Sequence, residues 1–354
     1  MLYLWFRERS RAEHQLIYDS AFLASDVRYA RPHEVAGVRM HGGFDAQGHY
    51  VSPRSLGRAE ALDAWEAALI DRGGALFDAD ASLLTGPRLP NLAQYQLLLR
   101  NGITQPFWNM LTITGKIEGR GRLLAQMQFP DLQALIVEDI STLALGHLNK
   151  GLLEIHGIDE GGEPEKGIGG HDVMWFVARD MVLGKQAHPD IEPPETIARP
   201  EAGKRLLPEI APEFEGMLSF LMNLLMIEFR AEIGFSNTQD LLRTPELFVD
   251  RREAAEEAAM LVGRIRQDEE IHVRSLQLYL GELRELRLRT ESGGTVAARD
   301  FVDEFWRGLV LWATVEQPAM AALAQRQTIE PIILAAPAGV EVLAEFDGLS
   351  DLAS

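Results

Sequence analysis

A glutamate and a histidine three residues apart interrupt an otherwise apolar helix face between positions 264 and 280. If RIRQDEEIHVRSLQLYL is a helix, Ile265, Glu269, His272, Leu276 and Tyr279 share one side, because their spacing follows the helical period. A charge on such a face is costly unless it is paired or bound to a metal ion. Glu-x-x-His is also the spacing that metal sites inside four-helix proteins use. Glu269 and His272 are therefore candidate metal ligands, and a buried ion pair is the alternative.

The most apolar stretch of the chain, FEGMLSFLMNLLMIEFRAEIGF, also contains a glutamate. Its composition is typical of a central helix that is buried on all sides. Glu228 shares a face with Leu221 and Leu224, and Glu232 follows one turn later. An acid in these surroundings has a raised pKa, pairs with a base such as Arg230, or coordinates a cation. Glu228 is therefore the single residue that most requires an explanation.

A third candidate region is DLQALIVEDISTLALGHLNKGLLEIHGIDE, in which we expect one long helix over residues 131–157. His147 and Glu154 continue the face that carries its first aliphatic side chains, again in steps of three and four residues. Glu138 and His156 fall on the opposite, polar face. The two glycines within this stretch could instead distort the helix and turn His147 and Glu154 outward.

His171 begins a short helix, 171–185, directly after the glycine-rich and acidic connection GIDEGGEPEKGIGG. This connection would return His171 to the end of the preceding helix, close to Glu154, although a surface position is the simpler alternative. A separate helix is expected over Leu92–Ile117, with Pro106 inside its pattern. It is rich in amides and has no acid before Glu118, so we expect no metal ligand from it.

Inward-facing Glu or His residues thus occur on four expected helices, at residues 131–157, 171–185, 213–235 and 250–288. Over residues 130–290 the chain resembles the ferritin-like di-iron carboxylate superfamily, whose four successive helices carry Glu, Glu-x-x-His, Glu and Glu-x-x-His. In this resemblance, Glu228 is the third-helix acid, Glu269 and His272 are the fourth-helix pair, and His171 is the second-helix histidine. Position 168 is Ile, so the acid expected three residues before His171 is missing.

The resemblance implies a metal centre held by His147, Glu154, His171, Glu228, Glu269 and His272, with Glu138 as the alternative to Glu154. It also implies that Glu228 and Glu232 are the catalytic residues. The cofactor would be two iron ions, or one manganese and one iron. The implied activity is the oxidation of a small, mainly apolar molecule by O₂, with an electron donor as partner. The apolar residues expected to line the site are Trp175, Phe176, Met222, Met226 and Tyr279.

Two other functions are compatible with the same residues. The missing acid at position 168 would suit a non-catalytic helical scaffold or binding protein with a degenerate metal site. A mononuclear metal hydrolase could use His147, His171 and His272 as ligands and Glu228 as the base.

The composition of the chain excludes several kinds of site and makes several partners improbable. The chain has 354 residues, of which 46% are hydrophobic, and no cysteine. Disulfides, thiolate metal sites and a cysteine nucleophile are therefore excluded. A formal net charge of −19 would repel nucleic acid in general. No stretch reaches the roughly 18 apolar residues that a membrane-spanning helix needs, and no signal peptide is recognisable, so we expect a cytoplasmic protein.

The expected fold class is all-α, a ferritin-like four-helix bundle with additional helices and a small N-terminal β-hairpin. Residues 1–55 form the hairpin or cap region, 56–330 the helical domain with its metal site in 130–290, and 331–354 a C-terminal tail. The hairpin strands are expected over Val38–Phe44 and His49–Ser52, around the turn Asp-Ala-Gln-Gly. The apolar last helix of the domain could serve a homodimer.

Overall fold

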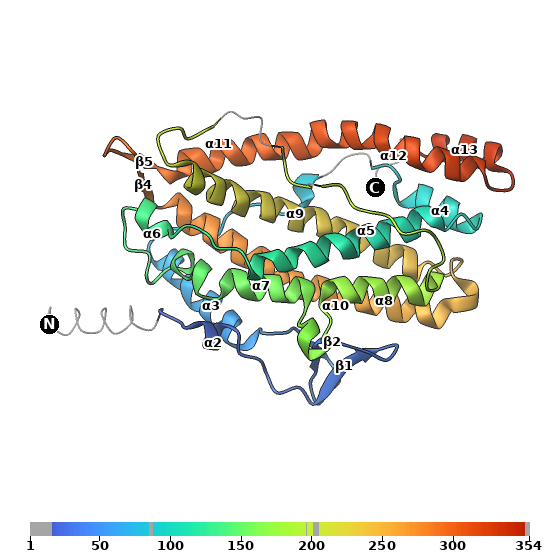
Figure 1. Ribbon diagram of the computed structural model, residues 1–354, viewed down its shortest axis with the longest axis horizontal. Coiled ribbons are helices and arrows are strands. Elements are labelled where there is room, and N and C mark those ends of the chain that lie inside the picture. The colour runs from blue at the N-terminus through green and yellow to red at the C-terminus, as the bar shows by residue number, and fades with distance from the viewer. Residues whose placement is uncertain (1–15, 85–87, 196, 201–204, 351–354) are drawn as a thin grey trace.

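Long helices make up most of the protein in the computed structural model, which describes residues 16–84, 88–195, 197–200 and 205–350 (Figure 1). The expected cap region and tail are thus described only for 16–55 and 331–350. The helices are α2 Ser20–Leu23, α3 Leu56–Asp71, α4 Leu92–Arg100, α5 Gln105–Gly121, α6 Leu132–Leu135, α7 Leu152–Gly161, α8 His171–Leu183, α9 Pro212–Arg243, α10 Arg252–Arg284, α11 Ala298–Leu311, α12 Gln317–Leu334 and α13 Gly339–Gly348. The strands are β1 Arg31–Val35, β2 Val38–Phe44, β3 Tyr50–Val51, β4 Arg287–Arg289 and β5 Thr295–Ala297. The mainly helical class expected from the sequence is confirmed.

A band of buried polar residues divides the centre of the molecule into two apolar cores. Helix α9 packs against α10, α5 packs against α7 and α8, and α8 also contacts α10. On α10, Leu276 belongs to one apolar cluster and Ile265 to the other. The acids and histidines of the candidate site lie between these two clusters. This arrangement removes the polar groups from water at a large cost, which must be offset by pairing or by a bound cation.

The prediction of a single helix over 131–157 is wrong, because the chain bends twice in this region. Helix α6 ends at Leu135, a 3-10 helix covers Ala144–Lys150, and α7 begins only at Leu152. Gly151 separates the last two with a φ of 121°, a backbone conformation that side chains rarely allow. The expected helix over 92–117 is likewise divided into α4 and α5, because Pro106 lies in the first turn of α5.

Helices α7 and α8 lie end to end in Figure 1, and the loop between them turns outward to meet the N-terminal sheet. The sheet has the order β1-β2-β3 and is antiparallel, with Gly43 opposite Val51 and Phe44 opposite Tyr50. The hairpin expected from the sequence is therefore confirmed, with β1 as an added strand. Strand β2 is also hydrogen-bonded to the loop between α7 and α8. His41 N donates to Gly169 O, and Gly169 N donates to Arg39 O. The sheet thus reaches the point where α7 ends and α8 begins.

Helices α11 and α12 run along the opposite side of the bundle and are joined by a turn of π-helix, Trp312–Glu316. The C-terminal segment continues as α13, whose Phe346 is buried in a small apolar cluster with Leu97 and Leu98 of α4. Exposed apolar side chains on α11 and α12 include Leu311 and Leu323, so the homodimer remains a prediction. In the described part of the chain, no helix is both long and apolar enough to cross a membrane.

Candidate metal centre

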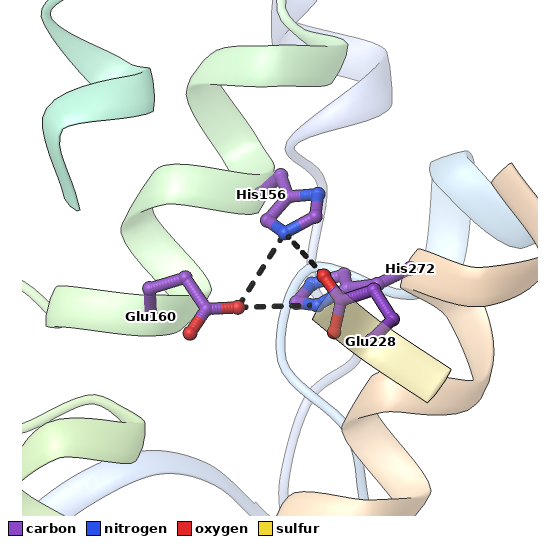
Figure 2. Close-up of side chains that lie close together, drawn as sticks. All are labelled: His156, Glu160, Glu228 and His272. Carbon is purple, nitrogen blue, oxygen red and sulfur yellow. Dashed lines mark ion pairs between the residues drawn. The ribbon is translucent and has the colours of Figure 1, made fainter. Parts of the chain in front are cut away.

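Two histidines and two glutamates from three helices converge at the first half of the site (Figure 2). His156 and Glu160 lie one turn apart on α7, Glu228 comes from α9, and His272 comes from α10. His156 Nε2 lies 3.2 Å from a Glu228 oxygen and 3.5 Å from Glu160 Oε1. His272 Nδ1 lies 3.3 Å from the same Glu160 oxygen. All four side chains are buried, so their ligand atoms face one another rather than water.

The second half of the site is built around His171, the first residue of α8. Its Nδ1 lies 3.0 Å from Glu269, 3.5 Å from Glu160 and 3.6 Å from Glu118 of α5. His171 and the three acids are all buried. Yet among the described residues this nitrogen has no hydrogen-bond partner. Three carboxylates thus lie within 3.6 Å of one imidazole nitrogen, and such a buried set of oxygen and nitrogen donors suits a bound cation.

Two glutamates connect the two halves. Glu160 directs Oε1 to His156 and His272, and its Oε2 to His171. Glu269 directs Oε1 to His171 and its Oε2, at 2.6 Å, to His272. Together with Glu118 and Glu228, they bring four carboxylates to the site. Two divalent cations would neutralise the four negative charges of these carboxylates. Two of the buried groups that could hold a metal ion therefore share Glu160, and Glu269 lies beside a histidine of each group.

An outer layer of ion pairs holds His272 in place. Its Nε2, on the side away from the glutamates, lies 3.0 Å from Asp159 Oδ2. Asp159 is completely buried and accepts hydrogen bonds from Arg54 at 2.8 Å and from Arg58 at 2.7 Å. These cations keep the pKa of Asp159 well below its usual range, although burial alone would raise it. A carboxylate behind a histidine in this way fixes which ring nitrogen is free to bind a metal.

His171 has a corresponding outer partner, Asp268. Its Nε2 lies 3.4 Å from Asp268 Oδ2, which also accepts a hydrogen bond from Tyr50 at 2.8 Å. His41 of β2 lies 3.3 Å from the same oxygen. Arg54 donates to His41 Nδ1 at 3.3 Å as well as to Asp159. The N-terminal region therefore supports both histidines, and Arg54 links the two supports.

The electrostatics of the metal-free site are strongly perturbed. Burial and the neighbouring acid Glu160 raise the pKa of Glu118 well above its usual range, while burial and Glu269 raise that of Glu228 to about 7. Burial would also raise the pKa of Glu160, but His171 and His156 hold it well below normal. Burial opposes the charged form of His171, yet Glu269 and Glu160 raise its pKa well above normal. Perturbation of this size is typical of functional sites.

These shifts predict an unusual dependence of stability on pH in the metal-free protein. Folding raises the pKa of Glu228 from its ordinary value of 4.5 to about 7, and it also raises the pKa values of His171 and His272. The folded protein therefore binds more protons than the unfolded chain near neutral pH. Its free energy of unfolding should fall as pH rises from about 6 to about 8, by up to roughly 1.4 kcal/mol per pH unit for each group.

Urea unfolding in the presence of a chelator measures this effect, and Glu228→Gln should reduce it. With metal bound, the slope should reverse, because the metal displaces these protons and binds more tightly at higher pH. Equal stability of the chelated protein at both pH values would contradict the assignment of these proton-binding groups.

Of the residues expected from the sequence, the structure brings together His171, Glu228, Glu269 and His272. His147 is buried elsewhere, because its Nδ1 faces Leu143 O at 2.7 Å and its Nε2 accepts from Tyr18 N. Glu154 is exposed on α7. The prediction that these two residues lie in the metal centre is therefore wrong. It assumed one continuous helix face from residue 136 onward, but the helix is interrupted at Gly151.

Two other acids also lie outside the centre. Glu232, which the sequence predicts to be catalytic, forms an ion pair with Arg266 and belongs to none of the buried groups that could hold a metal ion among the described residues. Glu138 accepts a hydrogen bond from Arg287 N. Of the apolar residues expected to line the site, Trp175 borders a pocket that also contains Glu118.

Sequence reasoning missed Glu118, His156 and Glu160. The signal for the last two was present: counted from Leu152 alone, the buried positions Ile155, His156 and Glu160 follow one helix face. No family model, curated protein or solved structure matches the chain. The functional assignment therefore depends on the geometry of the centre.

Proposed function

We propose that this protein is an O₂-dependent oxidoreductase of the ferritin-like di-metal carboxylate class, with two iron ions or a manganese–iron pair. The observation that carries the proposal is the double role of Glu160 and Glu269, each of which faces histidines of both halves of the site. Carboxylates shared between two metals, with histidines at the ends, are the usual construction of such centres in helical proteins.

Each side chain has a distinct task in this proposal. Glu160 and Glu269 would bridge the metals, Glu118 and His171 would complete one coordination sphere, and Glu228, His156 and His272 the other. Iron held by these residues would supply the redox chemistry with which O₂ oxidises an organic substrate, with an external electron donor as partner. Asp159 and Asp268 orient the two histidines on α10 and α8. Their support limits the movement of the ligands during the reaction.

Two of these residues, Glu118 and Glu160, would fill the two positions of the ferritin-like pattern for which the sequence alone indicated no acid that lies in the centre. Glu160 supplies the acid that is missing at position 168, since it precedes His171 across the loop between α7 and α8. Glu118 on α5 takes the part of the first-helix acid. The hydrolase alternative is weakened, because His147 has both ring nitrogens engaged away from the other two histidines.

Metal content tests the proposal. Protein purified without an affinity tag and supplied with Fe(II) under anaerobic conditions should bind about two irons per chain by elemental analysis. Both Glu228→Ala and His272→Ala should bind much less, whereas His49→Ala, which alters an exposed histidine, should bind as much as the unaltered protein. Iron-loaded protein should then consume O₂ when a reductant is added. Folded protein without metal would instead support the scaffold alternative.

A further inference from the structure

A pocket of about 320 Å³ lies directly beside the candidate metal centre and contains Glu118 in its wall. Its other walls are mainly apolar and include Met110 and Ile117 of α5, Trp175 of α8 and Phe235 of α9. The volume is within the range of small-molecule sites, roughly 300–1,000 Å³. Glu118 thus gives a molecule in this pocket access to the centre.

Two arginines, Arg88 and Arg230, line the same pocket, and neither forms an ion pair with an acid among the described residues. Arg230 donates one hydrogen bond to Ile197 O at 3.1 Å and lies over the ring of Trp312. Burial lowers the pKa of both side chains, and the charge of Arg88 lowers that of Arg230 further. By contrast, the buried Arg54 and Arg58 both pair with Asp159. Two cations without an acidic partner in the described part of the chain require an explanation, since the net charge is −19.

We propose that this pocket binds an amphipathic organic carboxylate, with its carboxylate on Arg88 and Arg230 and its apolar body directed toward Glu118. This inference names the substrate class of the proposed oxidation and therefore rests on it. Guanidinium groups form paired, charge-assisted hydrogen bonds with carboxylates, so an anionic head would satisfy both arginines. The apolar wall would accept a hydrocarbon chain or ring.

The shape of the region favours an extended molecule. Ile227, Gly234 and Thr238 follow one side of α9 along the pocket, a length of about 16 Å at 1.5 Å per residue. A second pocket, of about 240 Å³, shares Arg88, Arg230 and Gly234 with the first. It reaches Ala313 and Thr314 in the π-helical turn, a feature that is frequent at functional sites. The arginines therefore lie where the two pockets meet.

Gly234 offers a way to close the pocket without disturbing the fold. A Cβ atom at this position would meet no heavy atom within 4 Å, so Gly234→Leu should extend into the pocket. The replacement also removes a helix-weakening glycine from α9. Gly216 lies on the same helix, is exposed and has the same freedom, so Gly216→Leu is the matched control.

Calorimetry with decanoate, decan-1-ol and decyl phosphate tests the inference on the full chain. Decanoate should bind at least about tenfold more tightly than the alcohol, and Arg230→Gln should weaken decanoate roughly 10- to 100-fold while leaving the alcohol unchanged. Gly234→Leu should abolish binding of both, and Gly216→Leu should change neither. Arg179→Gln serves as a second control, since that arginine is paired with Asp180.

Equal affinity for decanoate and the alcohol, or full decanoate binding by Gly234→Leu, would overturn the inference. Tighter binding of decyl phosphate than of decanoate would overturn the choice of a carboxylate. Iron content, measured on the same samples, separates the two proposals. Iron without decanoate binding would leave the di-metal function and remove this inference. Decanoate binding without iron would leave a carboxylate-binding pocket and remove its role as the substrate site of the oxidation.

Discussion

Glu160→Ala should abolish the binding of both metals, although it alters only one of the proposed ligands. The two Glu160 oxygens face different halves of the site, Oε1 toward His156 and His272 and Oε2 toward His171. Loss of the side chain would remove one ligand from each metal and leave the buried histidines without their shared acid. Elemental analysis after anaerobic addition of Fe(II) should find almost no iron in the variant.

Two comparisons make this prediction specific. Glu118 faces only His171 among the histidines of the site, so Glu118→Ala should retain about one metal per chain. Glu154→Ala, on the exposed side of the same helix as Glu160, should retain both. Equal loss of iron in Glu118→Ala and Glu160→Ala would contradict the bridging role. Loss of iron in Glu154→Ala would favour the ligand set expected from the sequence alone.

The contrast between Glu154 and Glu160 shows which part of the site could be predicted from periodicity. Helices α9 and α10 are continuous for more than 30 residues each, so the face counted along them correctly joins Glu228, Glu269 and His272. Before α7, the chain bends at Gly151. The positions that share a helix face before such a bend cannot be used to assign faces after it. The sequence pattern therefore predicted that Glu154 faces the core and that His156 faces solvent, whereas the reverse is observed.

Other parts of the site depend on tertiary contacts that periodicity does not report. The amides near the start of the expected helix over 92–117 suggested a polar segment without ligands, but the centre lies at its far end, where Glu118 is buried. The hairpin was predicted, whereas the position of His41 beside Asp268 follows from the pairing of β2 with Gly169. A local sequence pattern contains no information about that pairing.

We expect Gly170→Ala to lose both iron and stability, because the chain crosses itself closely at this glycine. A Cβ atom on Gly170 would lie 2.3 Å from Gly162 N and 2.6 Å from Glu160 O. Both are backbone atoms, so relief requires the end of α7 or the start of α8 to move. These ends carry Glu160 and His171, one ligand from each side of the crossing. The free energy of unfolding of the metal-free protein should fall by roughly 3 kcal/mol or more.

Gly167→Ala, in the same loop, separates this effect from the general cost of replacing a loop glycine. Gly167 has a φ of 68°, and a Cβ atom there would meet nothing within 4 Å. Alanine should therefore cost only about 1 kcal/mol, for the left-handed backbone, and leave the iron content unchanged. Urea unfolding with a chelator and elemental analysis measure the two quantities separately. If Gly170→Ala kept full iron, the close crossing of α7 and α8 could not be what brings Glu160 and His171 together.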